Sequence, residues 1–258
     1  MRRQLLQMFV ILGVLTGSDI AYSGPVDLSS WLAEGTGMWE LEPGNSSVVQ
    51  TLNASPTVFY NNTDSQGRQL SGTIEVITEF DDDVVGFVLG YRAGGLINPS
   101  PDYLLIDWRQ TDFFNAANGC TQAAGLSIMR ITGDIGDFSG LTCRDGSEGV
   151  LELARGTTLG NVGWTNLVQY QFDLIFTESL VQVVVNGALE ISIAGTFADG
   201  AFGFYNASQA GVRYASVEEE AAMPVPVPEP GALLLLVTGL ITLLWMTPHR
   251  GRHTSRLA

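Results

Sequence analysis

Apolar and polar side chains alternate with a period of two along much of the chain, and this pattern predicts β-strands. The stretch YLLIDWRQ places Leu104, Ile106 and Trp108 on one face, because successive side chains of a strand point to opposite faces. Asp107 and Arg109 fall on the other face. The apolar face predicts burial, so we expect Trp108 to belong to the core and not to a binding surface.

Six further stretches have strand character and are separated by turns rich in Gly, Asn and Asp. They are residues 72–80, 84–91, 126–131, 168–176, 201–206 and 212–217. In the first of them, the alternation puts four residues on one face (Ile74, Val76, Thr78 and Phe80) and three on the other (Glu75, Ile77 and Glu79).

The sharpest local signal is the sequence LVQVVVNGALEISIAG. Two β-rich runs flank Asn186-Gly187, a pair that favours a type I′ hairpin because both central residues need positive φ. No segment before residue 231 shows a helical period. About a dozen short strands separated by turns predict an all-β domain over residues 24–217, folded as an antiparallel β-sandwich.

The first 23 residues follow the three-part pattern of an export signal. Arg2 and Arg3 form a basic start, residues 5–15 are mostly apolar, and Ala21-Tyr22-Ser23 offers small residues for cleavage. We expect residues 1–23 to be a signal peptide that is removed after Ser23.

The other end of the chain predicts a membrane anchor. Residues 231–247 contain no charge and seven leucines, and their 17 residues are at the lower limit for a transmembrane helix. The acidic and Pro-rich residues 218–230 suit an extended spacer. The positive-inside rule places residues 248–258 in the cytoplasm, because they contain Arg250, Arg252 and Arg256.

Pro228-Glu229-Pro230, the Leu-rich segment and the Arg-rich end together resemble the PEP-CTERM tail of exported bacterial proteins. The resemblance implies recognition by an exosortase. It also implies anchoring in the inner membrane before processing, followed by delivery to the cell surface or to an exopolysaccharide matrix. An ordinary single-span anchor is the alternative.

The expected exported part, residues 24–228, has seven arginines against 25 acidic residues, a formal charge of −18. Such a field repels nucleic acid and attracts cations. This part also contains neither lysine nor histidine. A Ser-His-Asp triad, histidine zinc ligands and Schiff-base chemistry are therefore excluded there.

The chain has two cysteines, Cys120 and Cys143. A lone pair in an oxidising compartment predicts a disulfide, with two free thiols as the alternative. The bridge would contribute about 3 kcal/mol to stability in the chain-entropy model.

Several stretches resemble, in order, the C-terminal domain of thrombospondins. They are Asp81-Asp82-Asp83 with GFVLGYR, then YLLIDWRQ, GLSIMRI, VGWTNLVQYQFDL and DGAFGFYNASQAGVRY. The likeness spans residues 38–217. It implies a jelly roll of the concanavalin and laminin-G class, and a calcium-binding adhesion module without catalytic activity.

Asp81, Asp82 and Asp83 stand directly before an apolar run, in a chain that has no lysine to balance them. The residues alone leave two interpretations open. One is a solvated acidic turn that ends a strand and repels edge pairing. The other is a Ca²⁺ site, because this ion takes six to eight oxygen ligands and a turn could bring all three carboxylates together. The family resemblance favours calcium, with Asp107 or Asp102 as a further ligand.

A carbohydrate-binding module of the exopolysaccharide matrix is the alternative function. Five aromatic residues could stack on sugar rings, although most aromatics in such strands belong to the core: Tyr91, Tyr103, Trp108, Trp164 and Tyr205. Residues 79–83 also come close to the Glu-x-Asp-x-Glu strand of jelly-roll glycoside hydrolases. Asp83 stands where the second Glu should be, however, and we expect no enzymatic activity.

Overall fold

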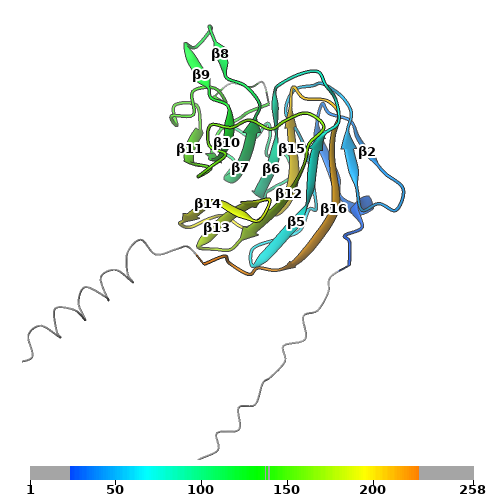
Figure 1. The fold of residues 1–258 in the computed structure, drawn as a ribbon. Coiled ribbons are helices and arrows are strands. Elements are labelled where there is room, and N and C mark those ends of the chain that lie inside the picture. The colour runs from blue at the N-terminus through cyan, green and yellow to red at the C-terminus, as the bar shows by residue number, and fades with distance from the viewer. Residues whose placement is uncertain (1–23, 137, 139, 227–258) are drawn as a thin grey trace, which may run out of the picture. The chain divides into compact units, whose positions relative to one another are not determined.

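The computed structural model describes residues 24–136, 138 and 140–226 (Figure 1). Their regular structure is almost entirely β. Within these residues the one helix is a single 3-10 turn, η1 (Leu28–Ser30), and sixteen strands make up the rest. The strands belong to one compact unit that ends at Ala222.

The strands form two seven-stranded sheets and one separate hairpin. Sheet A has, in spatial order, β1 (Leu32–Gly35), β4 (Thr57–Tyr60), β15 (Ala201–Ala207), β6 (Val84–Tyr91), β7 (Tyr103–Arg109), β10 (Gly125–Ile131) and β11 (Val150–Arg155). Sheet B has, in spatial order, β14 (Ala188–Ala194), β13 (Leu180–Val185), β12 (Gln169–Phe176), β5 (Arg68–Val76), β16 (Val212–Ala221), β3 (Val48–Gln50) and β2 (Trp39–Leu41). The hairpin pairs β8 (Phe113–Asn115) with β9 (Cys120–Gln122), and Figure 1 shows it beyond the ends of β7 and β10.

Every strand pair described is antiparallel, so the predicted antiparallel sandwich is confirmed. The main core lies between the sheets. Sheet A contributes Phe87 and Ile106 to it, and sheet B contributes Leu70 and Phe172. Trp108 is buried in the same core, as the alternation predicts. Apolar burial of this kind is the main favourable term in folding.

The outer face of sheet A is also buried, under a second apolar cluster. Leu105 and Val88 project to this side. Leu96, from the β6–β7 connection, and Ile135 and Leu141, from the β10–β11 connection, cover them. Both faces of β6 are therefore buried, which explains its continuous apolar sequence VVGFVLGY.

The predicted hairpin at Asn186-Gly187 is confirmed. It joins β13 to β14, and the two turn residues have φ of 49° and 77°. Both values lie in the left-handed region that a type I′ turn needs, and Asn and Gly enter that region at low cost.

The strand predicted over residues 72–80 has different bounds. It begins earlier, at Arg68, and ends at Val76. Phe80, which was expected on the same strand face as Ile74 and Val76, is 81% exposed, whereas those two residues are buried. The chain leaves the sheet because the Thr78 hydroxyl bonds the carbonyls of Phe80 and Ala210, which fixes a local turn in place of the next strand residue.

The last strand, β16, extends through Ala221, four residues beyond the end expected for the domain. It includes Glu218, Glu219 and Glu220 of the segment predicted to be an extended spacer. Near the start of the described chain, the Val26 N–H donates to the Val217 carbonyl over 2.7 Å. The two ends of the sandwich therefore lie beside each other.

The signal peptide predicted for residues 1–23, the sorting motif Pro228-Glu229-Pro230 and the membrane helix predicted for residues 231–247 lie outside the described residues, as do residues 248–258. A search of the described residues for a helix long and apolar enough to cross a membrane found none.

Candidate functional site

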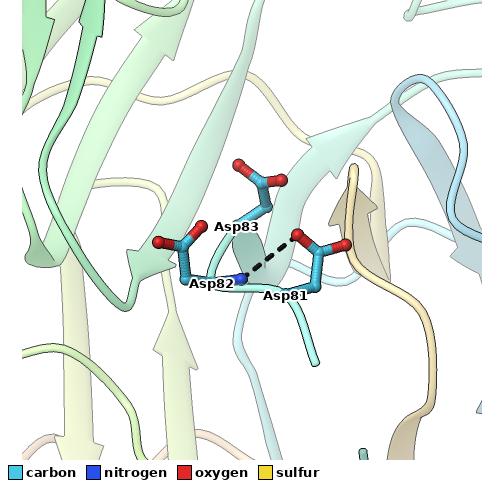
Figure 2. Close-up of side chains that lie close together, drawn as sticks. All are labelled: Asp81, Asp82 and Asp83. Atoms are coloured by element: carbon cyan, nitrogen blue, oxygen red, sulfur yellow. Dashed lines mark hydrogen bonds between the residues drawn. The ribbon is translucent and has the colours of Figure 1, made fainter. Parts of the chain in front are cut away.

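Asp81, Asp82 and Asp83 close the connection between β5 and β6, just before Val84 (Figure 2). Asp81 has φ of 78°, a left-handed conformation that Asp tolerates better than most residues. Its carboxylate accepts a hydrogen bond from the Asp82 N–H over 3.2 Å. The turn brings one oxygen of each carboxylate within 4.8 Å of the others. These three residues are called the aspartate triad below.

The carboxylates of the aspartate triad repel one another. Partial burial, a hydrogen bond with Asp83 and the charge of Asp83 raise the pKa of Asp81 from 3.8 to about 6. A raised pKa means that this site disfavours the charged form of Asp81. Negative charge therefore outweighs positive charge around Asp81.

One cation from the neighbouring strand meets the aspartate triad. The Arg109 guanidinium, on β7, lies 2.8 Å from Asp83 and 4.0 Å from Asp82. Arg109 is only 4% exposed, its Nε donates to the Thr111 carbonyl, and its charge lies 5.1 Å from the centre of the Phe113 ring. One guanidinium against three carboxylates leaves a formal excess of negative charge.

Sequence reasoning missed Arg109 because it looked for a lysine or a metal ion. The sequence did contain a signal for this contact. By alternation Arg109 lies on the same strand face as Asp107, and an antiparallel neighbouring strand that follows the aspartates would begin opposite Arg109. Val84 does pair with Arg109 in the register of β6 and β7. The pairing itself could not be read from one sequence.

Neutral groups complete the surroundings of the aspartate triad. The Asn53 amide donates to Asp81, and the Thr111 hydroxyl donates to Asp82. The Gln209 side-chain oxygen accepts from the Asp83 N–H over 3.2 Å. With the three carboxylates, these groups form a set of hard oxygen donors of the type that Ca²⁺ prefers. The residues present fit a calcium ion in donor type and in charge.

Asp107, predicted as a further ligand, lies elsewhere. It is 1% exposed on the outer face of sheet A. One carboxylate oxygen accepts from the Ser127 hydroxyl over 2.7 Å, and the other accepts from the Gln122 amide over 3.1 Å and from Arg144. Both oxygens thus have protein donors, and the structure does not bring Asp107 to the aspartate triad.

Asp102, the other predicted ligand, precedes β7 and lies at the opposite end of that strand from Arg109. Seven residues of extended chain separate the two, roughly 23 Å. Asp102 forms a two-point pair with Arg130, with distances of 2.8 and 2.7 Å. It therefore has no contact with the aspartate triad.

The predicted disulfide is confirmed: Cys120 and Cys143 are bonded, with their Cα atoms 5.0 Å apart. Cys120 begins β9, and Cys143 lies in the β10–β11 connection next to Arg144. The bridge ties the β8–β9 hairpin to the segment that covers the outer face of sheet A.

The acid pair of a glycoside hydrolase would have to project from one face of a strand here. Residues 77–83 lie between β5 and β6 and are not in a strand. The carboxylates of Glu79 and Asp81 are therefore not presented as alternate residues of a sheet.

Comparison with known proteins identifies relatives of this sandwich. A family model for the thrombospondin C-terminal region matches residues 35–222. Thrombospondin-2 of Gallus gallus is 24% identical over 197 residues, a match that covers 70% of this chain and 16% of that protein. This chain therefore spans less than a fifth of the thrombospondin's length.

Two solved structures from Bacillus subtilis have a similar fold. A protein of unknown function with a galectin-like fold aligns with a TM-score of 0.54 at 12% identity, over 80% of this chain and 97% of the other. The carbohydrate binding module CBM66 aligns with a TM-score of 0.51 at 9% identity, over 74% of this chain and 96% of the other. At these identities the likeness concerns the fold alone.

Proposed function

The chain belongs to the thrombospondin C-terminal region family, and we propose that its β-sandwich is a calcium-binding adhesion module without catalytic activity. The aspartate triad carries this proposal. Three carboxylates converge within 4.8 Å, and a single guanidinium meets them.

The charge balance of the aspartate triad favours a divalent cation. Asp81, Asp82 and Asp83 would hold the ion, and the side chains of Asn53 and Thr111, which already contact Asp81 and Asp82, would surround it. The ion would supply positive charge that Arg109 alone does not. Calcium suits a donor set of carboxylate, amide and hydroxyl oxygens, whereas magnesium demands a tighter octahedral shell.

Calcium at this position would also connect parts of the chain that are far apart in sequence. Asn53 precedes β4, the aspartate triad precedes β6, and Thr111 follows β7. Joining these three connections would stiffen one end of sheet A. A stiff end with exposed loops is a plausible adhesive surface, because binding residues are commonly presented by loops on a rigid scaffold.

The test is thermal unfolding of the purified full-length chain in millimolar Ca²⁺, in millimolar Mg²⁺ and in EGTA. A ligand that binds only the folded state adds about 2.7 kcal/mol at a hundredfold excess over its Kd. The melting temperature should rise by several degrees in calcium and less in magnesium. Asp81→Asn combined with Asp83→Asn should remove most of the shift, and Asp102→Asn, a matched control far from the triad, should keep it.

An unchanged melting temperature in calcium, or a full calcium shift in the double variant, would reject the calcium site. The aspartate triad would then be an acidic turn that Arg109 and water neutralise. That is the alternative that the sequence leaves open.

The module would act outside the cell. Residues 1–23 would direct export, and Pro228-Glu229-Pro230 would mark the tail for an exosortase, which would release the protein to the cell surface or to an exopolysaccharide matrix. In a strain that has the enzyme, Glu229→Ala should leave the protein unprocessed. Normal processing and display of that variant would instead support an ordinary single-span anchor.

Carbohydrate binding is the second candidate function, and a cavity beside the aspartate triad favours it. A glycan array probed with and without EGTA separates the two candidates. Calcium-dependent stability without sugar retention supports the adhesion module. Sugar retention that is indifferent to EGTA supports a carbohydrate-binding site distinct from the calcium site.

A further inference from the structure

A cavity of about 280 Å³ lies between the outer face of sheet A and the β8–β9 hairpin. Its floor includes Asp107 and Tyr205, which flank Gly86 at one level of the sheet. Phe113, on the hairpin, and Leu141, from the β10–β11 connection, form apolar walls. Of the aspartate triad, only Asp83 lines the cavity.

The charged groups around the cavity compensate one another. Asp107 is paired with Arg144, and both are nearly fully buried. Arg109 is paired with Asp83 over 2.8 Å. A charged ligand would have to break one of these pairs or enter without a counter-charge, and both are costly in a buried site. The cavity therefore favours a neutral ligand.

The floor also has an unused polar group. Tyr205 is 1% exposed, and its hydroxyl has no hydrogen-bond partner among the described residues. Burial raises the pKa of this hydroxyl well above its ordinary value, so it stays neutral and can both donate and accept. Buried hydroxyl groups in native proteins normally have a partner, and a bound ligand would provide one here.

The apolar walls of the cavity would contact the non-polar face of a ligand. Phe113 is 44% exposed at the mouth of the cavity, where an incoming ring could pack against it. Ligand pockets commonly measure about 300–1,000 Å³, so this cavity is just below that range and suits a very small ligand. A ligand of this size with hydroxyl groups at its edge and C–H groups on its face is a single sugar ring.

We propose that this cavity binds one neutral sugar residue, with the Tyr205 hydroxyl bonding a ring hydroxyl and Phe113 packing on the ring's C–H face. The proposal deepens the second candidate function and rests on it, but it does not depend on calcium. It assigns the site to the outer face of sheet A, next to the aspartate triad, with Asp83 in the wall between them.

The test uses the purified full-length chain and a panel of methyl glycosides of neutral hexoses, 6-deoxyhexoses and pentoses. Binding is measured by saturation-transfer NMR and calorimetry, in calcium and in EGTA. At least one neutral glycoside should bind with a Kd in the millimolar range or tighter, and equally in both buffers. The matched glycoside of glucuronic acid should bind at least about tenfold more weakly, because no free positive charge meets its carboxylate.

Three variants locate the binding. Tyr205→Phe should weaken affinity about three- to tenfold, the value of one neutral hydrogen bond, without lowering the melting temperature, because the hydroxyl has no protein partner to lose. Phe113→Ala should weaken affinity by a similar factor. Phe114→Ala is the matched control: this neighbour is 61% exposed and does not line the cavity, so affinity should be unchanged.

Each remaining outcome overturns the proposal in a recognisable way. If no glycoside of the panel binds, both the cavity and the second candidate function are rejected. If a glycoside binds but Tyr205→Phe and Phe113→Ala behave like the control, the sugar site lies elsewhere and only the cavity is rejected. Binding that disappears in EGTA would move the site to the calcium ion, and preference for a charged glycoside would overturn the ligand class.

Discussion

Asp107 and the aspartate triad lie at the same end of sheet A, but the groups that surround their carboxylates differ. Asp107 is 1% exposed and has a donor for each oxygen: Ser127 for one, and Gln122 and Arg144 for the other. The aspartate triad is partly exposed, and a single guanidinium contacts two of its three carboxylates, those of Asp82 and Asp83. The two places therefore differ not only in burial but also in the number of donors that reach each carboxylate oxygen.

The difference follows from where the donors originate. The donors to Asp107 come from β9, β10 and the β10–β11 connection, so three separate segments converge on one carboxylate. In the aspartate triad the carboxylates are consecutive in sequence, and a short turn cannot give each of them its own set of donors. The first site is complete within the protein, whereas the second can gain from a bound cation.

The largest effect that tests this comparison is expected at Asp107. Asp107→Asn would remove the buried charged partner of the Arg144 guanidinium and leave it only the less buried carboxylate of Glu152, 3.4 Å away. Breaking a buried ion pair in this way costs about 3–5 kcal/mol. Chemical denaturation of the full-length chain should show a lower midpoint with an unchanged slope.

Asp102→Asn is the control for that experiment, because its pair with Arg130 is over 40% exposed on both sides. Exposed ion pairs contribute about 0–1 kcal/mol, so this variant should be almost as stable as the wild type. Equal losses in the two variants would contradict the view that Asp107 depends on buried, dedicated donors.

Removing the disulfide tests whether the two sites are independent. The bridge closes a loop over a sequence separation of 23 residues, and its loss should cost about 3 kcal/mol in the chain-entropy model. Because Cys143 is adjacent to Arg144, the Asp107 site should become more accessible to hydrogen exchange in the variant Cys120→Ala, Cys143→Ala. The calcium-induced rise in melting temperature should remain, since the aspartate triad is not part of the bridged segment. If the variant loses both the protection of the Asp107 site from hydrogen exchange and the calcium-induced rise in melting temperature, the two sites are coupled.

The smallest expected effect on stability is at Asp81, where the substitution should stabilise the fold instead of destabilising it. In EGTA, Asp81→Asn should stabilise the fold at pH 7 by less than about 1 kcal/mol, because it removes repulsion at a partly exposed site. A raised carboxyl pKa in the folded state means that the folded protein binds more protons than the unfolded chain between the two pKa values. Stability from Asp81 is therefore present at low pH and is lost as the pH rises from about 4 through about 6.

Melting curves of the wild type and of Asp81→Asn at a series of pH values check this sign. In EGTA the two proteins should have the same melting temperature near pH 4, and the variant should have the higher one at pH 7. In calcium at pH 7 the wild type should have the higher melting temperature. If the melting temperature of the wild type instead rises relative to that of the variant as the pH rises in EGTA, the aspartate triad is not a repulsive site.

Much of the fold could be predicted from single-strand patterns. The alternation around Trp108, the Asn186-Gly187 turn and the apolar run that becomes β6 each depend on local rules, and the structure confirms them. The prediction that the strand ends at Phe80 was wrong. The turn that replaces the end of this strand depends on a hydrogen bond from the Thr78 hydroxyl to the carbonyl of Ala210, which is distant in sequence.

The candidate site was less accessible to such reasoning. Three consecutive aspartates are visible in the sequence, but the partner of Asp83 is not, because Arg109 reaches it only through the register of two strands. Asp107 was predicted to be a further calcium ligand with the help of the family resemblance, and its three donors come from segments that no periodicity connects. Tyr205 was named among the aromatic residues that could stack on a sugar ring, and the structure buries it. Its unpartnered hydroxyl is a property of the assembled sheet and leaves no trace in the sequence.

The hydrogen bond between the Val26 N–H and the Val217 carbonyl has a mechanical consequence. Tension applied through the two ends of the sandwich would pass directly from one to the other, along the edge of the molecule where Val26 meets β16. Sheet A, with the aspartate triad and the cavity, would lie outside that path of force. A protein under shear at a surface could then be pulled hard at its attachment points while its ligand-facing end keeps its shape.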